Sequence, residues 1–517
     1  MKRRDFLKVI GATGASVFVP SSLSLMSMYR SANAAVNYTG VNVVAPSIMP
    51  QVINIYLYGG PSELAGNLTN IVDIENNSQS SYVDAFDEPG ILTYDTDGTG
   101  INGQITPSGF WRDAGGVDMQ FMLDQSYMSV YRTLRKIKDQ TRSHRESILM
   151  NLKGSLDVNN GAGVGTRLAA MLYENRAQFE VVTTTLADGS PVIMTDLALP
   201  FVSFEGETPA FASDPDFSLP LELRNLTLSE DFDNPYSRNN NVHDTALDAL
   251  VSKVAAPAYN ARYQGVVDAF TSRATLEQRV TLLKTGIPVS PTTDTGGHTL
   301  PTLIDLDDIA ANGGTSQLTY PNTNFTDRIR AAVTLAIENP SSLYITVGDG
   351  FGSWDDHNDV PARYPQRMAA LMATLRAAML HIKYSNGTTP GGLPRSTDNI
   401  VINVFGDFGR LVNLNSSTGW DHGNNQNLYT FGGAAVRPVG ALGKVVGKTE
   451  RVGDSGTNDQ MTRALAGSYE FEPMSVAASI YSYFGATNPE ILTADPVLNP
   501  NGDPVIDETR VGEPKLF

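Results

Sequence analysis

The stretch Leu343 to Gly433 decides the fold of this chain, because it twice joins an apolar run to an acidic, glycine-rich turn. Its first run, Leu-Tyr-Ile-Thr-Val at 343–347, precedes Ser-Trp-Asp-Asp-His at 353–357. Its second run, at 400–410, reads Ile-Val-Ile-Asn-Val-Phe and continues into Gly-Asp-Phe-Gly-Arg. A polar loop then carries Gly-Trp-Asp-His-Gly at 419–423. Apolar runs of this length, separated by a helical segment, predict buried strands of a mainly parallel α/β sheet flanked by helices.

Four side chains in this stretch carry donor atoms that divalent cations prefer: Asp355, His357, Asp407 and His422. Loops at the carboxyl ends of parallel strands converge on one crevice, so we expect these side chains to meet there. Carboxylate oxygens and imidazole nitrogens suit zinc, manganese, magnesium or calcium. The alternative is that these residues cap helices and satisfy turns, because each short sequence is common. Their concentration favours a metal site, since two of the six histidines of the chain lie here beside acidic residues.

The segments around this stretch predict the remaining layers. Residues 52–58 are β-branched and aromatic and break at Gly-Gly-Pro-Ser, which predicts a first buried strand. Further short strands are expected near 200–204 and 428–433. Apolar residues after His357 recur at helical spacing and predict a helix roughly twenty residues long with methionines in the core: Met368, Leu371, Met372, Leu375, Met379 and Ile382. His381 lies beside that face, and we expect it at the solvent edge.

The sequence Arg142-Ser143-His144 precedes another predicted helix. Serine is a common helix cap, and this is the simpler interpretation of Ser143. The alternative is that Ser143 is a nucleophile favoured by the helix dipole and the backbone amides, with Arg142 and His144 beside it.

The first 34 residues predict an export signal. Arg3 and Arg4 precede an apolar segment diluted by glycine and serine, which is the pattern of the twin-arginine pathway. Ala32-Asn33-Ala34 provides a small-x-small cleavage site. We therefore expect a periplasmic or extracellular protein that the twin-arginine machinery exports in folded form. The alternative interpretation, an amphipathic helix at the amino terminus of a cytoplasmic protein, would leave the paired arginines unexplained.

Composition limits the partners of the chain. It has 517 residues, no cysteine and a net charge of -18, and the leader carries five basic residues against one acidic residue. The mature part is therefore near -22, which argues against nonspecific nucleic-acid binding. Thiolate metal sites and disulfides are impossible without cysteine. After the leader no apolar run is long enough for stable membrane insertion.

The mature chain, 35–517, predicts a single α/β domain. Strand, loop and helix alternate without a repeat or an evident linker. Residues 185–326 are rich in proline, aspartate and asparagine and are expected to form loop-rich insertions.

The motifs occur in an order that resembles the exported bacterial proteins grouped as domain-of-unknown-function family 1501. The resemblance spans nearly the whole mature chain and rests on the leader and on five further sequences: Tyr58-Gly59-Gly60-Pro61-Ser62, Arg142-Ser143-His144, Trp354-Asp355-Asp356-His357, Asp407-Phe408-Gly409-Arg410 and Asp421-His422-Gly423. That family looks like a distant branch of the alkaline phosphatase and sulfatase superfamily. Members of that superfamily hold one or two divalent metals at strand ends. They cleave phosphate or sulfate esters with a serine, threonine or modified cysteine nucleophile.

The resemblance implies roles for individual residues. Asp355, His357 and His422 would be ligands of one metal, and Asp407 stands where the superfamily has an aspartate ligand. Ser143, with His144 beside it, lies in the region of the nucleophile. Arg410 would meet the anionic oxygens of a small-molecule or polymer ester as a forked donor.

Three departures from the family pattern predict an incomplete centre. Glu63 to Asn67 contain no aspartate where relatives have one, Phe408 stands where a histidine is usual, and Gln426-Asn427 replace another histidine. We therefore expect at most one tightly bound metal and slow or absent ester hydrolysis. Two functions follow: a metal-dependent phosphate or sulfate ester hydrolase, or a catalytically degenerate relative that acts as a binding or assembly component of the cell envelope.

Overall fold

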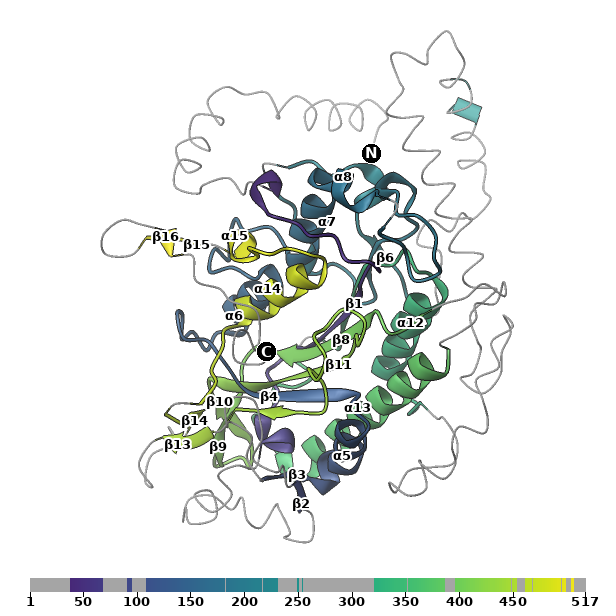
Figure 1. Cartoon of the computed structure of the whole chain (residues 1–517). Coiled ribbons are helices and arrows are strands. Elements are labelled where there is room, and N and C mark those ends of the chain that lie inside the picture. The colour runs from purple at the N-terminus through teal and green to yellow at the C-terminus, as the bar shows by residue number, and fades with distance from the viewer. Residues whose placement is uncertain are drawn as a thin grey trace.

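An eight-stranded sheet forms the centre of the protein in the computed structural model (Figure 1). The structure describes residues 38–67, 91–94, 108–230, 249–250, 253, 320–385, 396–452, 461–498 and 504–505, apart from 182, 216, 351, 448, 467 and 494. The predicted leader and most of the predicted insertion at 185–326 lie outside these residues. The strands, in their order across the sheet, are β12 (Val445–Val446), β4 (Met128–Arg135), β11 (Asn425–Gly432), β8 (Ile400–Gly406), β1 (Gln51–Leu57), β7 (Tyr344–Gly348), β5 (Phe201–Ser203) and β6 (Leu226–Thr227).

The sheet is mainly parallel, which confirms the predicted α/β class. β1 pairs in parallel with β7 and with β8, and β5 pairs in parallel with β7 and with β6. β11 runs antiparallel to its neighbours β4 and β8. The carboxyl ends of β1, β7 and β8 therefore lie side by side at one edge.

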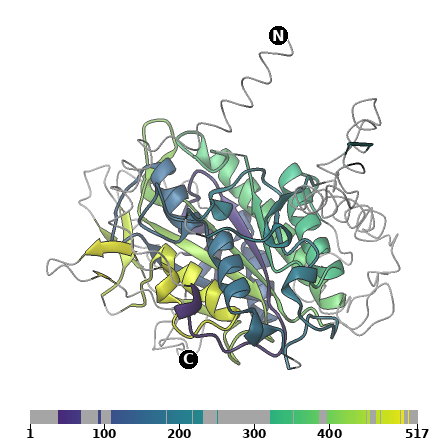
Figure 2. The same cartoon turned by 90° about the horizontal axis from the view of Figure 1, so that it is seen from above.

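Both faces of the sheet are buried under helices, because successive residues of each strand alternate between two apolar clusters. On β1, Ile53, Ile55 and Leu57 enter one cluster, whereas Val52 and Tyr56 enter the other. The first cluster packs under α5 (Gly116–Asp124), α12 (Asn324–Glu338) and α13 (Val360–Tyr384), and the second under α6 (His144–Lys153), α7 (Val164–Glu174) and α14 (Pro473–Tyr483). Seen from above, green α12 and α13 and yellow α14 lie on opposite sides of the strands (Figure 2).

The remaining elements are short. Two-stranded sheets are formed by β2 (Ile91–Tyr94) with β3 (Ser108–Trp111), β9 (Arg410–Leu414) with β10 (Trp420–His422), β13 (Thr449–Val452) with β14 (Met461–Ala464), and β15 (Asp495–Leu498) with β16 (Pro504–Val505). Short helices are α8 (Arg176–Phe179) and α15 (Glu490–Thr493). No helix among the described residues has the length and apolar character needed to cross a membrane.

The predicted long helix exists and is longer than expected. α13 spans 25 residues and begins near the acidic loop, with Pro361 in its first turn. Its methionines at 368, 372 and 379 are buried, as predicted. His381 is not at the solvent edge: its side chain is buried, and its Nδ1 lies 3.1 Å from the Tyr320 hydroxyl. Tyr320 lies shortly before α12, far away in the sequence, so helical spacing alone could not reveal this partner.

Candidate metal centre

The predicted donors come together at the carboxyl edge of the sheet. Asp355 and His357 lie in the loop after β7, and Asp407 follows β8 directly. His422 ends β10, and His144 is the first residue of α6. Parallel pairing of β1 with β7 and β8 brings these loops to one place, as expected for an open α/β sheet.

Four of these side chains form a compact donor set: His144, Asp355, His357 and His422, whose nearest ligand atoms all lie within 4.8 Å of one another. The Nε2 atom of His422 lies 3.0 Å from that of His144 and 2.9 Å from that of His357. Asp355 Oδ1 lies 3.3 Å from His144 Nε2 and 3.0 Å from His357 Nε2. No second group of three or more such donors comes together in the part of the chain that the structure describes.

The other ring nitrogen of each histidine has its own acceptor. Nδ1 of His144 lies 2.8 Å from Asp407 Oδ2, and Nδ1 of His357 lies 3.1 Å from Asp421 Oδ1. Nδ1 of His422 lies 2.9 Å from the carbonyl oxygen of Arg142, to which only a protonated nitrogen can bond. Histidines that bind metals nearly always donate the second N–H to a carboxylate or a carbonyl in this way.

With Nδ1 protonated, a neutral imidazole presents a lone pair at Nε2. If all three imidazoles take this form, three lone pairs and one carboxylate oxygen face one another. Burial, and then the charge of Arg410, lower the pKa of His422 to about 4, so this imidazole is neutral near pH 7. A cation bound between these acceptors would relieve their repulsion. Nitrogen ligands lie about 2.0–2.1 Å from zinc, which would place tetrahedral donors roughly 3.3 Å apart. Five of the donor pairs in this group are separated by 2.9–3.7 Å. The donor set could therefore hold a divalent metal ion.

Two glycines allow the loops to approach closely enough for this arrangement. Gly59, after β1, has a φ of +112°, and a Cβ there would lie 2.4 Å from the backbone nitrogen of Asp355. A Cβ at Gly419 would lie 1.9 Å from the carbonyl carbon of His357. A side chain at either position would push apart the loops that carry the donors.

Asp407 lies outside the donor set, although it was predicted as a ligand. Its side chain is fully buried, and Oδ2 accepts hydrogen bonds from the Gly59 backbone N–H at 3.1 Å and from His144. The carboxylate therefore holds the loop after β1 and orients the imidazole of His144. His144, which was predicted as a catalytic neighbour of Ser143, belongs to the donor set instead. The hydrogen bond between the His144 imidazole and the buried Asp407 carboxylate distinguishes these two roles. Only a three-dimensional structure reveals that hydrogen bond.

Arg410 is buried rather than exposed to a substrate. Its guanidinium lies 2.7 Å from Asp355 Oδ1 and donates to the backbone carbonyls of Gly59, Gly60, Trp354 and Trp420. Its side chain is 0% exposed. Although burial of Asp355 acts in the opposite direction, the hydrogen bond and charge of Arg410 lower the pKa of that carboxyl. Arg410 thus ties three loops together and keeps Asp355 ionised, and it does not offer a fork to an ester in this arrangement.

The residues that depart from the family pattern have structural partners. Phe408 is buried, and its ring centroid lies 4.7 Å from that of His144 and 4.6 Å from that of His422. The Gln426 amide bonds both backbone groups of Gly406, and the Asn427 amide donates to the Glu63 carbonyl. Phe408 thus packs against two of the imidazoles. The side-chain amides of Gln426 and Asn427 hold the backbone of Gly406 and Glu63 in place.

Ser143 occupies the N-cap position of α6, but its hydroxyl makes no capping hydrogen bond. The residue is exposed, and its backbone N–H donates to Thr141 Oγ1 at 3.2 Å. The side chain is therefore not committed to the helix end.

Lys136 fixes the segment that carries His144. It follows β4, is buried, and donates to the Thr141 carbonyl and to the Ser147 hydroxyl. Its Nζ lies 5.1 Å from the centroid of the Phe408 ring. Burial lowers the pKa of Lys136 to about 8. The ammonium thus links the loop before His144, at Thr141, to α6, at Ser147.

Replacing Lys136 with methionine is expected to weaken zinc binding about tenfold, the usual effect of losing a group that orients a ligand. The midpoint of thermal unfolding should change little, because methionine removes a desolvated charge as well as its hydrogen bonds. Calorimetric titration with zinc measures the affinity, and the exposed Lys138→Met variant is the control. Equal affinities in the two variants would show that Lys136 does not position the donor set.

Comparison of the chain with models of protein families, with curated proteins and with solved structures found no match.

Proposed function

We propose that this chain is a hydrolase of phosphate or sulfate esters that uses a single divalent metal and belongs to the alkaline phosphatase and sulfatase superfamily. The observation that carries the proposal is the donor set itself: three inward-facing Nε2 atoms and Asp355 Oδ1, each nitrogen fixed by an acceptor at Nδ1. Its place at the carboxyl edge of a mainly parallel sheet is the place that the family resemblance implies.

Solvent access favours catalysis over a purely structural role. The side chains of His357 and Asp355 are 41% and 32% exposed, so a substrate can approach the donors from that side. Catalytic zinc sites keep an accessible position, whereas structural sites are closed. A divalent ion held here would act as a Lewis acid toward an ester oxygen.

The segment around His144 supplies the other groups that ester cleavage needs. The uncommitted hydroxyl of Ser143 stands at the amino end of α6, where the helix dipole favours the negative charge of an attacking oxygen. Arg142 and Arg145 flank Ser143 and His144 in sequence. Both arginines are exposed, so they can attract an anionic ester. In this proposal the Ser143 hydroxyl oxygen attacks the phosphorus or sulfur, and the ester alcohol leaves with the serine proton. Water then hydrolyses the serine ester and releases phosphate or sulfate, while the two arginines bind the anionic oxygens.

One observation favours the alternative function. Four protein donors would be enough to complete a tetrahedral shell around a metal, as in structural zinc sites. In that case the metal would fix the loops, and the chain would be a binding or assembly component of the cell envelope.

Hydrolysis of p-nitrophenyl phosphate and p-nitrophenyl sulfate by the zinc-loaded or manganese-loaded protein tests the two functions. We expect slow turnover that chelation removes and that Ser143→Ala lowers at least about a hundredfold. The exposed Ser416→Ala variant should keep full activity. Metal binding without turnover on either ester would favour the structural role, and turnover unchanged in Ser143→Ala would exclude this serine as the nucleophile.

Export by the twin-arginine pathway is part of the proposal. Replacing both Arg3 and Arg4 with lysine should retain the precursor in the cytoplasm, because the pathway reads the paired arginines. Immunoblots of periplasmic and cytoplasmic fractions measure the distribution, with Lys8→Arg as the control. Normal amounts of the shortened protein in the periplasm would contradict this route.

A further inference from the structure

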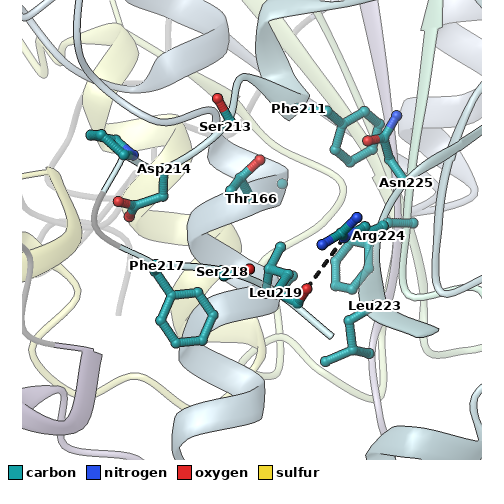
Figure 3. Close-up of a pocket in the computed structure, with 14 residues that line it drawn as sticks. Thr166, Phe211, Ser213, Asp214, Phe217, Ser218, Leu219, Leu223, Arg224 and Asn225 are labelled. Atoms are coloured by element: carbon teal, nitrogen blue, oxygen red, sulfur yellow. Dashed lines mark hydrogen bonds between the residues drawn. The ribbon is translucent and has the colours of Figure 1, made fainter. Parts of the chain in front are cut away.

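A cavity of about 580 Å³ lies between α7 and the segment 211–225 (Figure 3). Phe201, the first residue of β5, contributes to its wall. The cavity is therefore near the amino end of that strand, whereas the candidate metal centre is at the carboxyl edge of the sheet. Ligand pockets in proteins commonly have volumes of about 300–1,000 Å³, so the cavity has the size of a small-molecule site.

The inner wall of the cavity is apolar. Phe201 and Leu223 are buried, and the rings of Phe211 and Phe217 are partly exposed. On the helix side the wall includes Ala169 of α7, whose small side chain leaves the space open. An apolar group that enters this space leaves water, which is the main driving force for the binding of apolar ligands.

Aromatic contacts hold two of these walls in place. The ring of Phe217 meets those of Tyr38 and Tyr173 edge-on, with centroids 5.5 Å and 6.4 Å apart. The ring of Phe211 meets that of Tyr344 in the same way at 5.8 Å. Walls fixed before binding lower the entropic cost of ordering them around a ligand.

The exposed part of the lining is mostly polar, and it carries a cation. Ser213, Ser218, Arg224 and Asn225 are all exposed. Arg224 donates through Nε to the Leu219 carbonyl at 3.3 Å and forms no ion pair with a residue that the structure describes. Its two terminal nitrogens thus remain available to an anion, which a guanidinium binds best with two parallel hydrogen bonds.

Asp214, the acidic group of the lining, is already engaged. Figure 3 shows Asp214 and Arg224 on opposite sides of the cavity. The Asp214 carboxylate accepts a hydrogen bond from the Tyr38 hydroxyl and has a further interaction of its own. Burial, and then this hydrogen bond, raise the pKa of Tyr38, so its hydroxyl keeps the proton that it donates. An ammonium group would have to compete with these partners, so the cavity does not favour a cationic ligand.

We propose that this cavity binds a monocarboxylate with an apolar body, of the size of a medium-chain fatty acid. The carboxylate would bond the guanidinium of Arg224 at the exposed side, and the chain would pack against Phe211 and Phe217. A phosphate monoester fits less well, because its second negative charge meets no further cation in the described lining. An uncharged apolar ligand leaves Arg224 without an anion. This site depends neither on the metal centre nor on ester hydrolysis.

Calorimetric titration of the purified protein with octanoate, octanamide, octylammonium and butanoate tests the proposal. Octanoate should bind at least tenfold more tightly than octanamide or octylammonium, because both lack the negative charge. It should also bind at least tenfold more tightly than butanoate, which has half of the apolar chain. A chelator in the buffer should leave the affinity for octanoate unchanged, since the carboxylate does not bind at the metal centre.

Three variants assign the binding to this cavity. Arg224→Gln should weaken octanoate at least tenfold and leave octanamide within twofold, and the fold should survive because Arg224 is exposed. Asp214→Asn should not weaken octanoate, because an amide oxygen can still accept from Tyr38 and a negative charge is removed. Arg363→Gln is the control, since Arg363 is an exposed arginine of α13, on the other face of the sheet, and donates to Asn358.

The proposal is overturned if octanoate gives no binding at millimolar concentration. It is also overturned if octanamide, octylammonium or butanoate binds as tightly as octanoate, or if Arg224→Gln and Arg363→Gln bind octanoate alike.

Discussion

Replacing His144 with alanine is expected to weaken zinc binding by more than about a hundredfold. The variant loses one of three nitrogen donors, and even groups that only orient a ligand contribute about 10–100-fold to metal affinity. The fold should survive, because His144 is the first residue of α6 and is partly exposed. Competition with a coloured zinc chelator measures the affinity. A loss of this size would distinguish a metal ligand from a residue that acts only in ester hydrolysis.

Two further variants make the comparison specific. Asp407→Asn should weaken zinc binding about tenfold, since Asp407 contacts His144 and is not one of the four grouped donors. His381→Gln removes a buried histidine that bonds Tyr320, far from the donors in sequence, and should leave the affinity unchanged. Equal zinc affinities for His144→Ala and His381→Gln would remove His144 from the donor set.

Replacing Arg410 with methionine is expected to lower the free energy of unfolding by about 3–5 kcal/mol. The guanidinium is fully buried and bonds four carbonyls and Asp355, and methionine leaves these acceptors without donors. Denaturation of the metal-free protein in urea measures the loss. Arg363→Met, which removes an exposed arginine of α13, should change stability by less than about 0.5 kcal/mol.

The outcome for Arg410 decides between two roles. A large loss of stability in the metal-free protein identifies a structural ion pair that holds the loops. Unchanged stability combined with a raised KM for an anionic ester would instead support the substrate-binding role that the family resemblance implies.

The sequence predicted the central layers of the fold well, because the relevant signals are local. Apolar runs at 52–58, 343–347 and 400–405 match β1, β7 and β8, and the stripe after His357 matches α13. β11 was also expected as a strand, but its antiparallel direction was not, since no local pattern states which neighbour a strand joins. The relation to alkaline phosphatases stays a prediction.

The candidate site was harder to predict, because ligand roles depend on which nitrogen and which carboxylate meet. Asp355, His357 and His422 were proposed as ligands, and the structure places their donor atoms together. The roles of Asp407 and His144 could not be distinguished in sequence, since both carry donor atoms and both lie at element ends. Their hydrogen bond places one behind the other.

Long-range contacts account for what the sequence did not indicate. Lys136 lies in the basic segment 132–138, and lysine side chains usually lie at the surface. It is nevertheless buried beside Phe408, more than two hundred residues away. The cavity at α7 likewise depends on where Phe211 and Phe217 meet distant tyrosines. Neither contact leaves a periodic signal.

The metal content of the purified protein, combined with X-ray absorption of the zinc-loaded form, tests the metal centre most directly. The donor set predicts one zinc per chain, with three imidazole nitrogens and one oxygen at about 2.0–2.1 Å. Substitution of His357 by alanine should remove one nitrogen from that shell. A protein that takes up no zinc at micromolar concentration, or one that binds two ions tightly, would contradict it.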